Sequence, residues 1–285
     1  MFYIINKEKG ISSFKAINQF AKKNKILKIG HSGTLDPLAS GLLLCCSDDD
    51  LKLLNYINNK SKKYKVTLIL GFKTDSYDIT GKIIETSNNI VKDDYKIKKF
   101  FDNLIGKSLQ IPPVFSAKKI NGQRSYDLAR KGEFVEIKPV EITTYSYEIL
   151  YLDLHKQELC FNIHVSNGTY IRSIVNDLGN YLNTFATMSE LDRYEISSLL
   201  FNEDLSYQNI LPKLFQNLIK ISKNDVIEIQ MNHFNYIIKT DWFNRIVNNN
   251  GQYILIDQYS FLPYGIIEIS QKKLKIVKLF GKRLI

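Results

Sequence analysis

The sequence has few cysteines and histidines and no long apolar run, and these absences exclude several protein classes. Two of its three cysteines, Cys45 and Cys46, are neighbours, which suits neither a disulfide framework nor a zinc-binding pair. The four histidines are scattered and form no metal-ligand motif. The apolar run near residues 42–46 is far shorter than the roughly 20 residues that cross a bilayer. We therefore expect reduced, buried thiols, no structural zinc and no membrane helix.

Composition and charge point to a globular protein with an affinity for polyanions. Of the 285 residues, 44% are hydrophobic and 24% are charged, so the chain is neither disordered nor fibrous. Lys and Arg number 39 against 29 Asp and Glu, a net charge of +10, which favours nucleic acid as a partner. A solvated, lysine-rich surface is the alternative. Residues 1–5 predict a strand rather than a signal peptide, so a cytoplasmic location is expected.

Local patterns predict short helices and strands, with a change of character near Leu205. Helices are expected over residues 14–23, where Ser12 or Ser13 is the cap, and over 51–57, 95–105, 125–131 and 170–182. Strands are expected over 1–6, 64–71, 140–151, 158–165, 251–257, 266–269 and 274–280. A glycine-rich loop is expected over 30–41. We place a domain boundary near 205, which separates a main domain, 1–205, from a C-terminal region, 206–285.

The densest chemical signal lies in the glycine-rich loop and centres on Asp36. Because Asp36 precedes Pro37, its backbone is restricted to extended conformations, which limits where its carboxylate points. One rigidly held carboxylate suits a nucleophile or base at a sugar anomeric carbon, where positive charge develops on cleavage. The alternative is a turn that is closed by an Asx hydrogen bond. Spacing alone does not decide between them.

The loop closely resembles motif II of the TruB-type pseudouridine synthases, the tRNA pseudouridine-55 synthase family. Its residues read Gly30-His31-Ser32-Gly33-Thr34-Leu35-Asp36-Pro37-Leu38-Ala39-Ser40-Gly41. Other blocks that resemble the family follow in the family's order: Lys7 through Ser13, Lys63-Tyr64-Lys65-Val66 with Thr74 through Gly81, Gln110 through Gly132, Val165 through Gly179, and Leu191 with Arg193. The resemblance covers residues 4–193, about two-thirds of the chain.

The resemblance implies a fold and a reaction. The fold is α/β (α+β), the pseudouridine-synthase fold: a large mixed, mainly antiparallel sheet flanked by helices, a thumb insertion at about 110–138 and a small C-terminal region compatible with a PUA-like module. The reaction breaks the N1–C1′ bond of uridine, turns the base and joins C5 to C1′, after the base has left its stack. No redox step or net hydrolysis occurs, so neither cofactor nor metal is expected. The implied partner is the tRNA elbow, bound by a monomer.

The resemblance also implies roles for single residues. Asp36 matches the catalytic aspartate, Tyr64 the tyrosine that receives the base, and Arg172 the arginine that pairs with the aspartate through charge-assisted hydrogen bonds. Taken alone, each would be a turn, core or surface residue. The expected substrate-binding residues are His31, Gly33, Tyr170 and Leu191 around the base, and Lys118, Lys119, Arg124 and Arg130 along the RNA phosphates in the thumb insertion.

Two departures from the family pattern leave alternatives open. Glu8 replaces the usual proline of the opening motif, and Asp48, Asp49 and Asp50 follow motif II in place of the usual sequence. We interpret the three acids as the start of a helix, where negative charge is favourable; a magnesium site of a nuclease is the alternative. A non-catalytic tRNA-binding or tRNA-folding protein and a guide-RNA-dependent synthase are further alternatives. Segment 37–41 follows the stand-alone bacterial form rather than the guide-dependent one.

Overall fold

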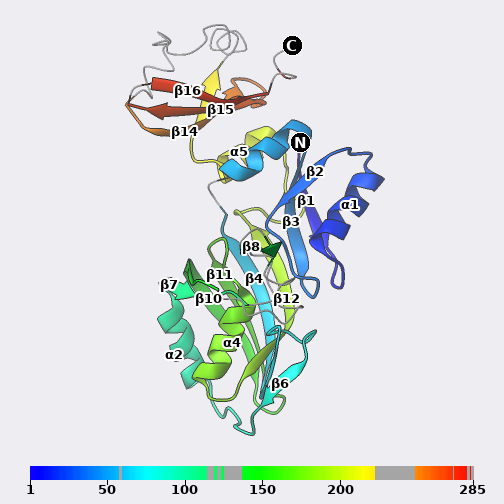
Figure 1. Ribbon diagram of the computed structural model, residues 1–285, viewed down its shortest axis with the longest axis vertical. Coiled ribbons are helices and arrows are strands. Elements are labelled where there is room, and N and C mark those ends of the chain that lie inside the picture. The colour runs from blue at the N-terminus through cyan, green and yellow to red at the C-terminus, as the bar shows by residue number, and fades with distance from the viewer. Residues whose placement is uncertain are drawn as a thin grey trace.

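An eight-stranded sheet forms the larger part of the computed structural model (Figure 1). The structure describes residues 1–57, 60–113, 119–120, 123–124, 137–221, 248–271, 273–280 and 283. The main path of the sheet runs β1 (Phe2–Lys7), β3 (Ser40–Ser47), β12 (Ala186–Ile196), β4 (Lys62–Leu70), β11 (Glu158–Val165), β10 (Val140–Asp153) and β7 (Gly106–Gln110), while β2 (Ile29–Ser32) pairs with β3. Within the described part of this sheet, only the β3–β12 pair is parallel. The expected mixed, mainly antiparallel sheet is therefore confirmed.

Strand β3 lies between two hydrophobic cores and contributes side chains to both. Leu43 and Cys45 face the core of the main sheet, whereas Leu44 and Cys46 face a second core toward the C-terminal region. The two-residue period of a strand thus places adjacent cysteines on opposite faces. All three cysteines are free and buried, as expected, and burial raises the pKa of the Cys45 thiol to about 12.

Strands β2, β3 and β12 were not expected from local patterns. The interval 30–41 contains the end of β2 and the start of β3, so only its middle is a loop. At Gly41 the backbone has a φ of 107°, and a Cβ there would lie 2.4 Å from the carbonyl oxygen of Arg193 on β12. A residue with a side chain could not make this close parallel contact. Strand β12 carries Glu190 and Asp192 among its apolar residues, and its pairing with two distant strands stabilises it.

The described helices largely follow the expected ranges, and the helix expected over 125–131 lies outside the described residues. They are α1 (Ser13–Lys23), the 3₁₀ helix η1 (Asp48–Tyr56), α2 (Tyr95–Leu104), α4 (Ile171–Tyr181) and α5 (Tyr207–Leu214). The Ser12 hydroxyl accepts a hydrogen bond from the Lys15 backbone N–H at 3.1 Å, which confirms the expected cap of α1. Helices α2 and α4 lie side by side on one face of the sheet (Figure 1). The expected helix at 51–57 is instead a 3₁₀ helix that begins at Asp48.

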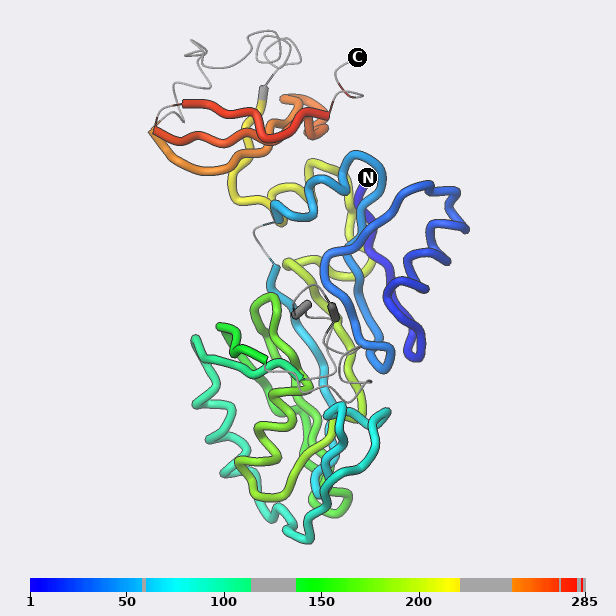
Figure 2. The backbone as a smooth tube through the Cα atoms, in the orientation of Figure 1, coloured from blue at the N-terminus to red at the C-terminus, as the bar shows by residue number. Residues whose placement is uncertain are grey.

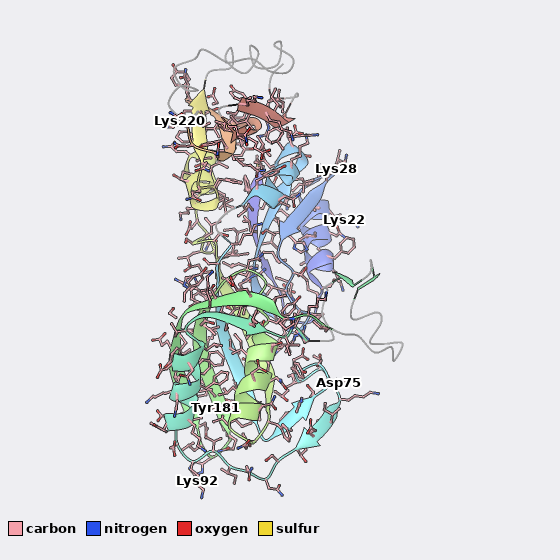
Figure 3. All side chains as sticks on the ribbon, turned by 60° about the vertical axis from the view of Figure 1, so that its left-hand side comes forward. Lys22, Lys28, Asp75, Lys92, Tyr181 and Lys220 are labelled. Carbon is pink, nitrogen blue, oxygen red and sulfur yellow. The ribbon has the colours of Figure 1, made fainter. Side chains whose placement is uncertain are left out.

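A smaller sheet lies at one end of the long axis, and Figure 2 shows α5 and η1 between it and the main sheet. It contains β13 (Leu218–Ile221), β14 (Gly251–Asp257), β15 (Pro263–Ser270) and β16 (Lys273–Leu279). In Figure 3, Lys220 marks this end, whereas the hairpin of β5 (Phe72–Thr74) and β6 (Ile83–Thr86) lies near Asp75, toward the other end. No helix among the described residues is long and apolar enough to span a membrane.

Asp50 ties the C-terminal region to the main sheet. Its side chain is fully buried at the first turn of η1, where the sequence places an acidic helix start. One carboxylate oxygen accepts from Arg283 Nη2 at 2.8 Å, and the other accepts from the Tyr207 hydroxyl at 2.6 Å. The second core, which lies near this point, draws residues from β3, α5 and β14. Because its oxygens are engaged in this way, Asp50 has a structural role in joining the two parts.

The hydrogen bond to Asp50 makes Tyr207 a test of this junction. Tyr207→Phe removes one of the donors to a buried carboxylate oxygen that also pairs with the Met1 ammonium group, which should lower the free energy of unfolding by about 1 kcal/mol. Chemical denaturation of the whole chain measures the change. Tyr259→Phe is the matched control, because Tyr259 is 84% exposed. Equal stabilities for the two variants would contradict the assigned role of Tyr207.

Candidate active site

The backbone on both sides of Asp36 is fixed by residues of the first strand and helix. Ser13 Oγ donates to the Leu35 carbonyl at 3.0 Å and accepts from the Leu35 N–H at 2.9 Å. On the other side, the Pro37 carbonyl accepts from the Gly10 N–H at 2.7 Å and from Lys7 Nζ at 3.3 Å. The loop therefore presents Asp36 from a backbone that is anchored at the residue before it and the residue after it.

Lys7 is a buried cation that links the turn after β1 to the loop that carries Asp36. Its Nζ also donates to the carbonyls of Glu8 at 2.9 Å and Ile11 at 2.8 Å. The side chain is about 1% exposed, and burial lowers its pKa to about 8. Glu8 contributes its backbone carbonyl to this arrangement, and proline also has a carbonyl, so this contact does not depend on which of the two residues is present.

Arg172 and Asp36 form a bidentate ion pair at the start of α4. Arg172 Nε donates to Asp36 Oδ2 at 2.8 Å, and Nη2 donates to Oδ1 at 3.0 Å. The Arg172 side chain is only 6% exposed, whereas that of Asp36 keeps 35% of its surface open. A bidentate pair fixes both position and orientation of the carboxylate. Asp36 is thus held rigidly from behind while its outer surface remains accessible to a ligand.

Asp78 and Ser76 complete the surroundings of the guanidinium. Arg172 Nη1 donates to the Ser76 carbonyl at 2.9 Å, and Asp78 Oδ2 lies 3.8 Å from Nε. Asp78 is itself buried, and its Oδ1 accepts from the Thr80 N–H at 2.9 Å and the Ser76 hydroxyl at 3.0 Å. The positive charge of Arg172 therefore faces two carboxylates, of which only Asp36 opens toward the cavity.

A cavity of about 280 Å³ lies in front of Asp36. Tyr64 and Leu191, both buried, form its apolar part, and Tyr64 pairs across the sheet with Arg193. The rim consists of more exposed residues, among them Thr34 and the turn 167–169. An aromatic wall beside a fixed carboxylate suits a planar ring that is stacked on Tyr64 with its attached group at Asp36.

Lys62 adds a second cation to the cavity wall. It precedes Tyr64 by two residues on β4, so both side chains face the cavity. Lys62 Nζ donates to Asn167 Oδ1 at 2.6 Å. Burial, followed by the positive charges of Arg193 and Lys60, lowers the pKa of Lys62 to about 7.

Gln110 fixes the part of the cavity wall that Tyr170 forms. Its Nε2 donates to the Tyr170 carbonyl at 3.0 Å, and its Oε1 accepts from the Tyr170 N–H at 2.8 Å. Ser173 Oγ then donates to the Ile111 carbonyl at 2.8 Å. The end of β7 is thereby joined to the first turn of α4, the turn that carries Arg172.

Comparison with known proteins identifies the family. Residues 20–171, more than half of the chain, match the sequence model of the TruB family pseudouridylate synthase (N terminal domain). The chain belongs to the TruB family of pseudouridylate synthases. The tRNA pseudouridine synthase B of Mycoplasmopsis pulmonis is 43% identical over 284 residues, 100% of this chain and 96% of that protein. The Aquifex aeolicus protein of the same name is 40% identical over 208 residues, 73% of this chain and 72% of that protein.

Solved structures show that the TruB chain has the fold expected from its sequence. The crystal structure of a Cbf5-Nop10-Gar1 complex contains a chain that is 18% identical and superimposes with a TM-score of 0.66. The match covers 97% of this chain and 84% of that one. The family, the fold and the isomerase class expected from the sequence are therefore confirmed.

The cavity of this TruB chain brings together most of the residues expected from the sequence. Asp36, Tyr64 and Arg172 line it, as do Gly33, Tyr170 and Leu191. His31 lies on β2 and is not part of the lining; its Nδ1 is buried without a partner among the described residues, and burial lowers its pKa. Of the thumb residues, Lys118 and Arg130 lie outside the described residues, and Lys119 and Arg124 are described only as backbone, in β8 (Lys119–Ile120) and β9 (Gln123–Arg124).

Sequence reasoning missed several residues that shape the cavity. The alternation along β4 places Lys62 on the same face as Tyr64, and this pattern could have predicted Lys62 as a residue of the site. Gln110 and Asp78 lie within segments that resemble the family, but nothing in their spacing indicates that they contact Tyr170 and Arg172. Their roles depend on contacts between segments that are distant in sequence.

Replacing Lys62 should change how stability depends on pH. Its folded-state pKa of about 7 lies below the ordinary value of 10.5, so between these values the unfolded chain binds a proton that the folded chain lacks. Relative to Lys62→Met, the free energy of unfolding of the unmodified protein should therefore rise as pH rises through this interval. Urea denaturation at a series of pH values measures the difference, and parallel curves would contradict it. Lys65→Met is the control, because Lys65 is exposed on the opposite face of β4.

Proposed function

We propose that this chain is a stand-alone tRNA pseudouridine synthase that isomerises the T-loop uridine at position 55. The observation that carries the proposal is the bidentate Asp36–Arg172 pair at the mouth of a cavity whose inner wall is Tyr64. The names of the relatives, tRNA pseudouridine synthase B, support the choice of tRNA. The basic net charge of +10 suits an RNA partner.

The proposed reaction is an isomerisation in which no atom is gained or lost overall. The N1–C1′ bond breaks, the uracil turns, and C5 bonds to C1′; the C5 proton leaves and N1 acquires a proton. The uridine first leaves its stack and enters the cavity, where its ring lies against Tyr64 and beside Leu191. This places the sugar near Asp36, whose carboxylate then acts at the sugar or at the base.

Arg172 serves this reaction as a positioning residue. Each Asp36 oxygen accepts one of its N–H groups, which fixes the plane of the carboxylate before the substrate arrives. Asp78 and the Ser76 carbonyl in turn fix the guanidinium. Asp36 therefore requires little rearrangement at the moment of reaction.

The proposal extends to the remaining parts of the chain. Lys118, Lys119, Arg124 and Arg130 grip RNA phosphates in a thumb insertion at about 110–138, His31 lies near the displaced base, and the C-terminal region 206–285 is a PUA-like module. The protein is a cytoplasmic monomer that needs no cofactor, metal or obligate protein partner. These statements remain predictions, and the family resemblance is their support.

The first test of the proposal removes the charge of Asp36. Purified protein with chelator and an unmodified tRNA transcript, tritiated at uracil C5, should release tritium from the T-loop uridine. Asp36→Asn should abolish release while tRNA binding changes little, because phosphate contacts dominate affinity. Asp93→Asn is the control, because Asp93 is exposed and distant in sequence from the site. Turnover by Asp36→Asn would remove this residue from its role, and binding without release by the unmodified protein would favour the tRNA-binding alternative.

The second test concerns how the RNA is held. Affinity for tRNA should fall linearly on a plot of log K against log salt concentration, with a slope of roughly 0.7 to 0.9 for each neutralised phosphate. Filter binding over a series of potassium chloride concentrations measures this slope. An affinity that does not change with salt would contradict the phosphate-binding part of the proposal.

A further inference from the structure

The wall of the cavity holds more positive than negative charge. Among the described residues Asp36 is its one lining carboxylate, and it is already paired with Arg172. Lys62 is 7% exposed, and among the described residues its hydrogen-bond partner is the neutral Asn167; none of their carboxylates forms an ion pair with it. Burying an ammonium group without a counter-charge is costly. The arrangement therefore lacks an anion that a ligand could supply.

Arg193 reinforces this imbalance. The Arg193 side chain is fully buried; its Nε donates to the Leu42 carbonyl at 2.8 Å and its Nη2 to the Gly33 carbonyl at 3.1 Å. Its Nη1 has no hydrogen-bond partner among the described residues. A Cβ on Gly33 would lie 3.1 Å from Lys62 Nζ and 3.7 Å from Arg193 Nη1, so both cations approach the same point of the backbone. That point is three residues from Asp36.

The position of Lys62 within the cavity indicates which part of the substrate it meets. Its partner Asn167 and the adjacent Gly168 are exposed, and they form the rim. Tyr64 and Leu191, where the uracil would stack, are both buried. A nucleotide with its base against Tyr64 and its sugar at Asp36 would leave its backbone phosphates nearer the rim. The Lys62 side chain is itself buried, but its ammonium group reaches the rim through its hydrogen bond to Asn167.

We propose that Lys62 binds a backbone phosphate directly attached to the flipped nucleotide, with Asn167 holding the ammonium group in place. The inference rests on the proposed function and names a residue that recognises the RNA backbone within the same site. Beyond the proton given to Asn167, the ammonium group has two others for phosphate oxygens. Gly33 suits this role because a side chain at its position, where φ is 89°, would press on Lys62 Nζ.

The charges around Lys62 favour an anionic ligand. Arg193 from β12 and Lys60 before β4 both lower its pKa, and no carboxylate of the described residues opposes them among the causes of the shift. A phosphate would supply that missing opposite charge and favour the protonated amine. The same contact would orient the sugar of the flipped nucleotide toward Asp36.

A binding cycle with a modified RNA tests the proposal. The probe is a T-arm stem–loop that carries one uncharged methylphosphonate, either 5′ or 3′ of the target uridine. For one of these two positions, the uncharged linkage should weaken binding to the unmodified protein by about tenfold. Lys62→Met should weaken binding of the normal RNA by a similar factor, and the two changes together should cost no more than either alone. Lys62→Arg should retain most of the affinity, and Lys62→Met should lower the salt slope by about one unit.

Several outcomes would overturn the assignment. Losses that multiply when Lys62→Met and the uncharged linkage are combined would show that the two groups act independently. Normal affinity with slow tritium release in Lys62→Met would place the amine on the uracil instead of the phosphate. Lys65→Met should behave as the unmodified protein does, because Lys65 is exposed on the opposite face of β4.

Two further measurements keep the test decisive. Thermal unfolding establishes that Lys62→Met is folded; if it is not, full affinity of the unmodified protein for both uncharged RNAs still refutes the proposal. The binding cycle needs no turnover, whereas absence of tritium release by the unmodified protein refutes the proposed function separately.

Discussion

The bidentate pair between Arg172 and Asp36 is the constraint on which the arrangement of the site depends. It joins the first turn of α4 to the loop between β2 and β3, and the contacts with Ser76 and Asp78 add the turn after β5. A guanidinium offers its N–H groups in one plane and at fixed angles. The segment that carries Arg172 and the two segments that carry its partners must therefore adopt one geometry together, and the large sheet provides the rigid frame that makes this possible.

The energetics of the site follow from how each buried charge is compensated. Lys7 satisfies its ammonium with three backbone carbonyls, and Arg172 does so with carboxylates and a carbonyl. Lys62 and Arg193 are the exceptions within the described residues, because Lys62 has one neutral amide oxygen as its compensation and Arg193 Nη1 has no hydrogen-bond partner. A charge that is buried in this way destabilises the free protein, and proteins retain such groups mainly at functional positions.

Local sequence patterns were sufficient for elements that have a clear period. The alternation in β4, β10 and β11 and the amphipathic spacing of α1, α2 and α4 predicted these elements within a few residues. Strands β3 and β12 were not predicted, because neither has a clear two-residue alternation. Strand β3 is apolar on both faces, and β12 interleaves Glu190, Asp192 and Arg193 with apolar residues. Both are stabilised by pairing across the sheet, which no local window contains.

The site was predicted to the extent that its chemistry lies in contiguous motifs. Asp36, Tyr64 and Arg172 belong to such motifs, and the structure brings them to one cavity. The contacts of Gln110 were not foreseen, because its partner Tyr170 lies 60 residues away in the chain. A polar residue in isolation does not reveal which distant backbone group it will satisfy once folded.

The two hydrogen bonds between Gln110 and Tyr170 have a mechanical consequence. Gln110 ends β7, just before the chain leaves the sheet, and Ile111 is held by Ser173 one residue beyond Arg172. Because Gln110 is paired with β10 as well as with Tyr170, a displacement of Ile111 would act on the first turn of α4 as well as on the sheet. The position of Ile111 and the orientation of the Asp36 carboxylate are thus coupled through the first turn of α4.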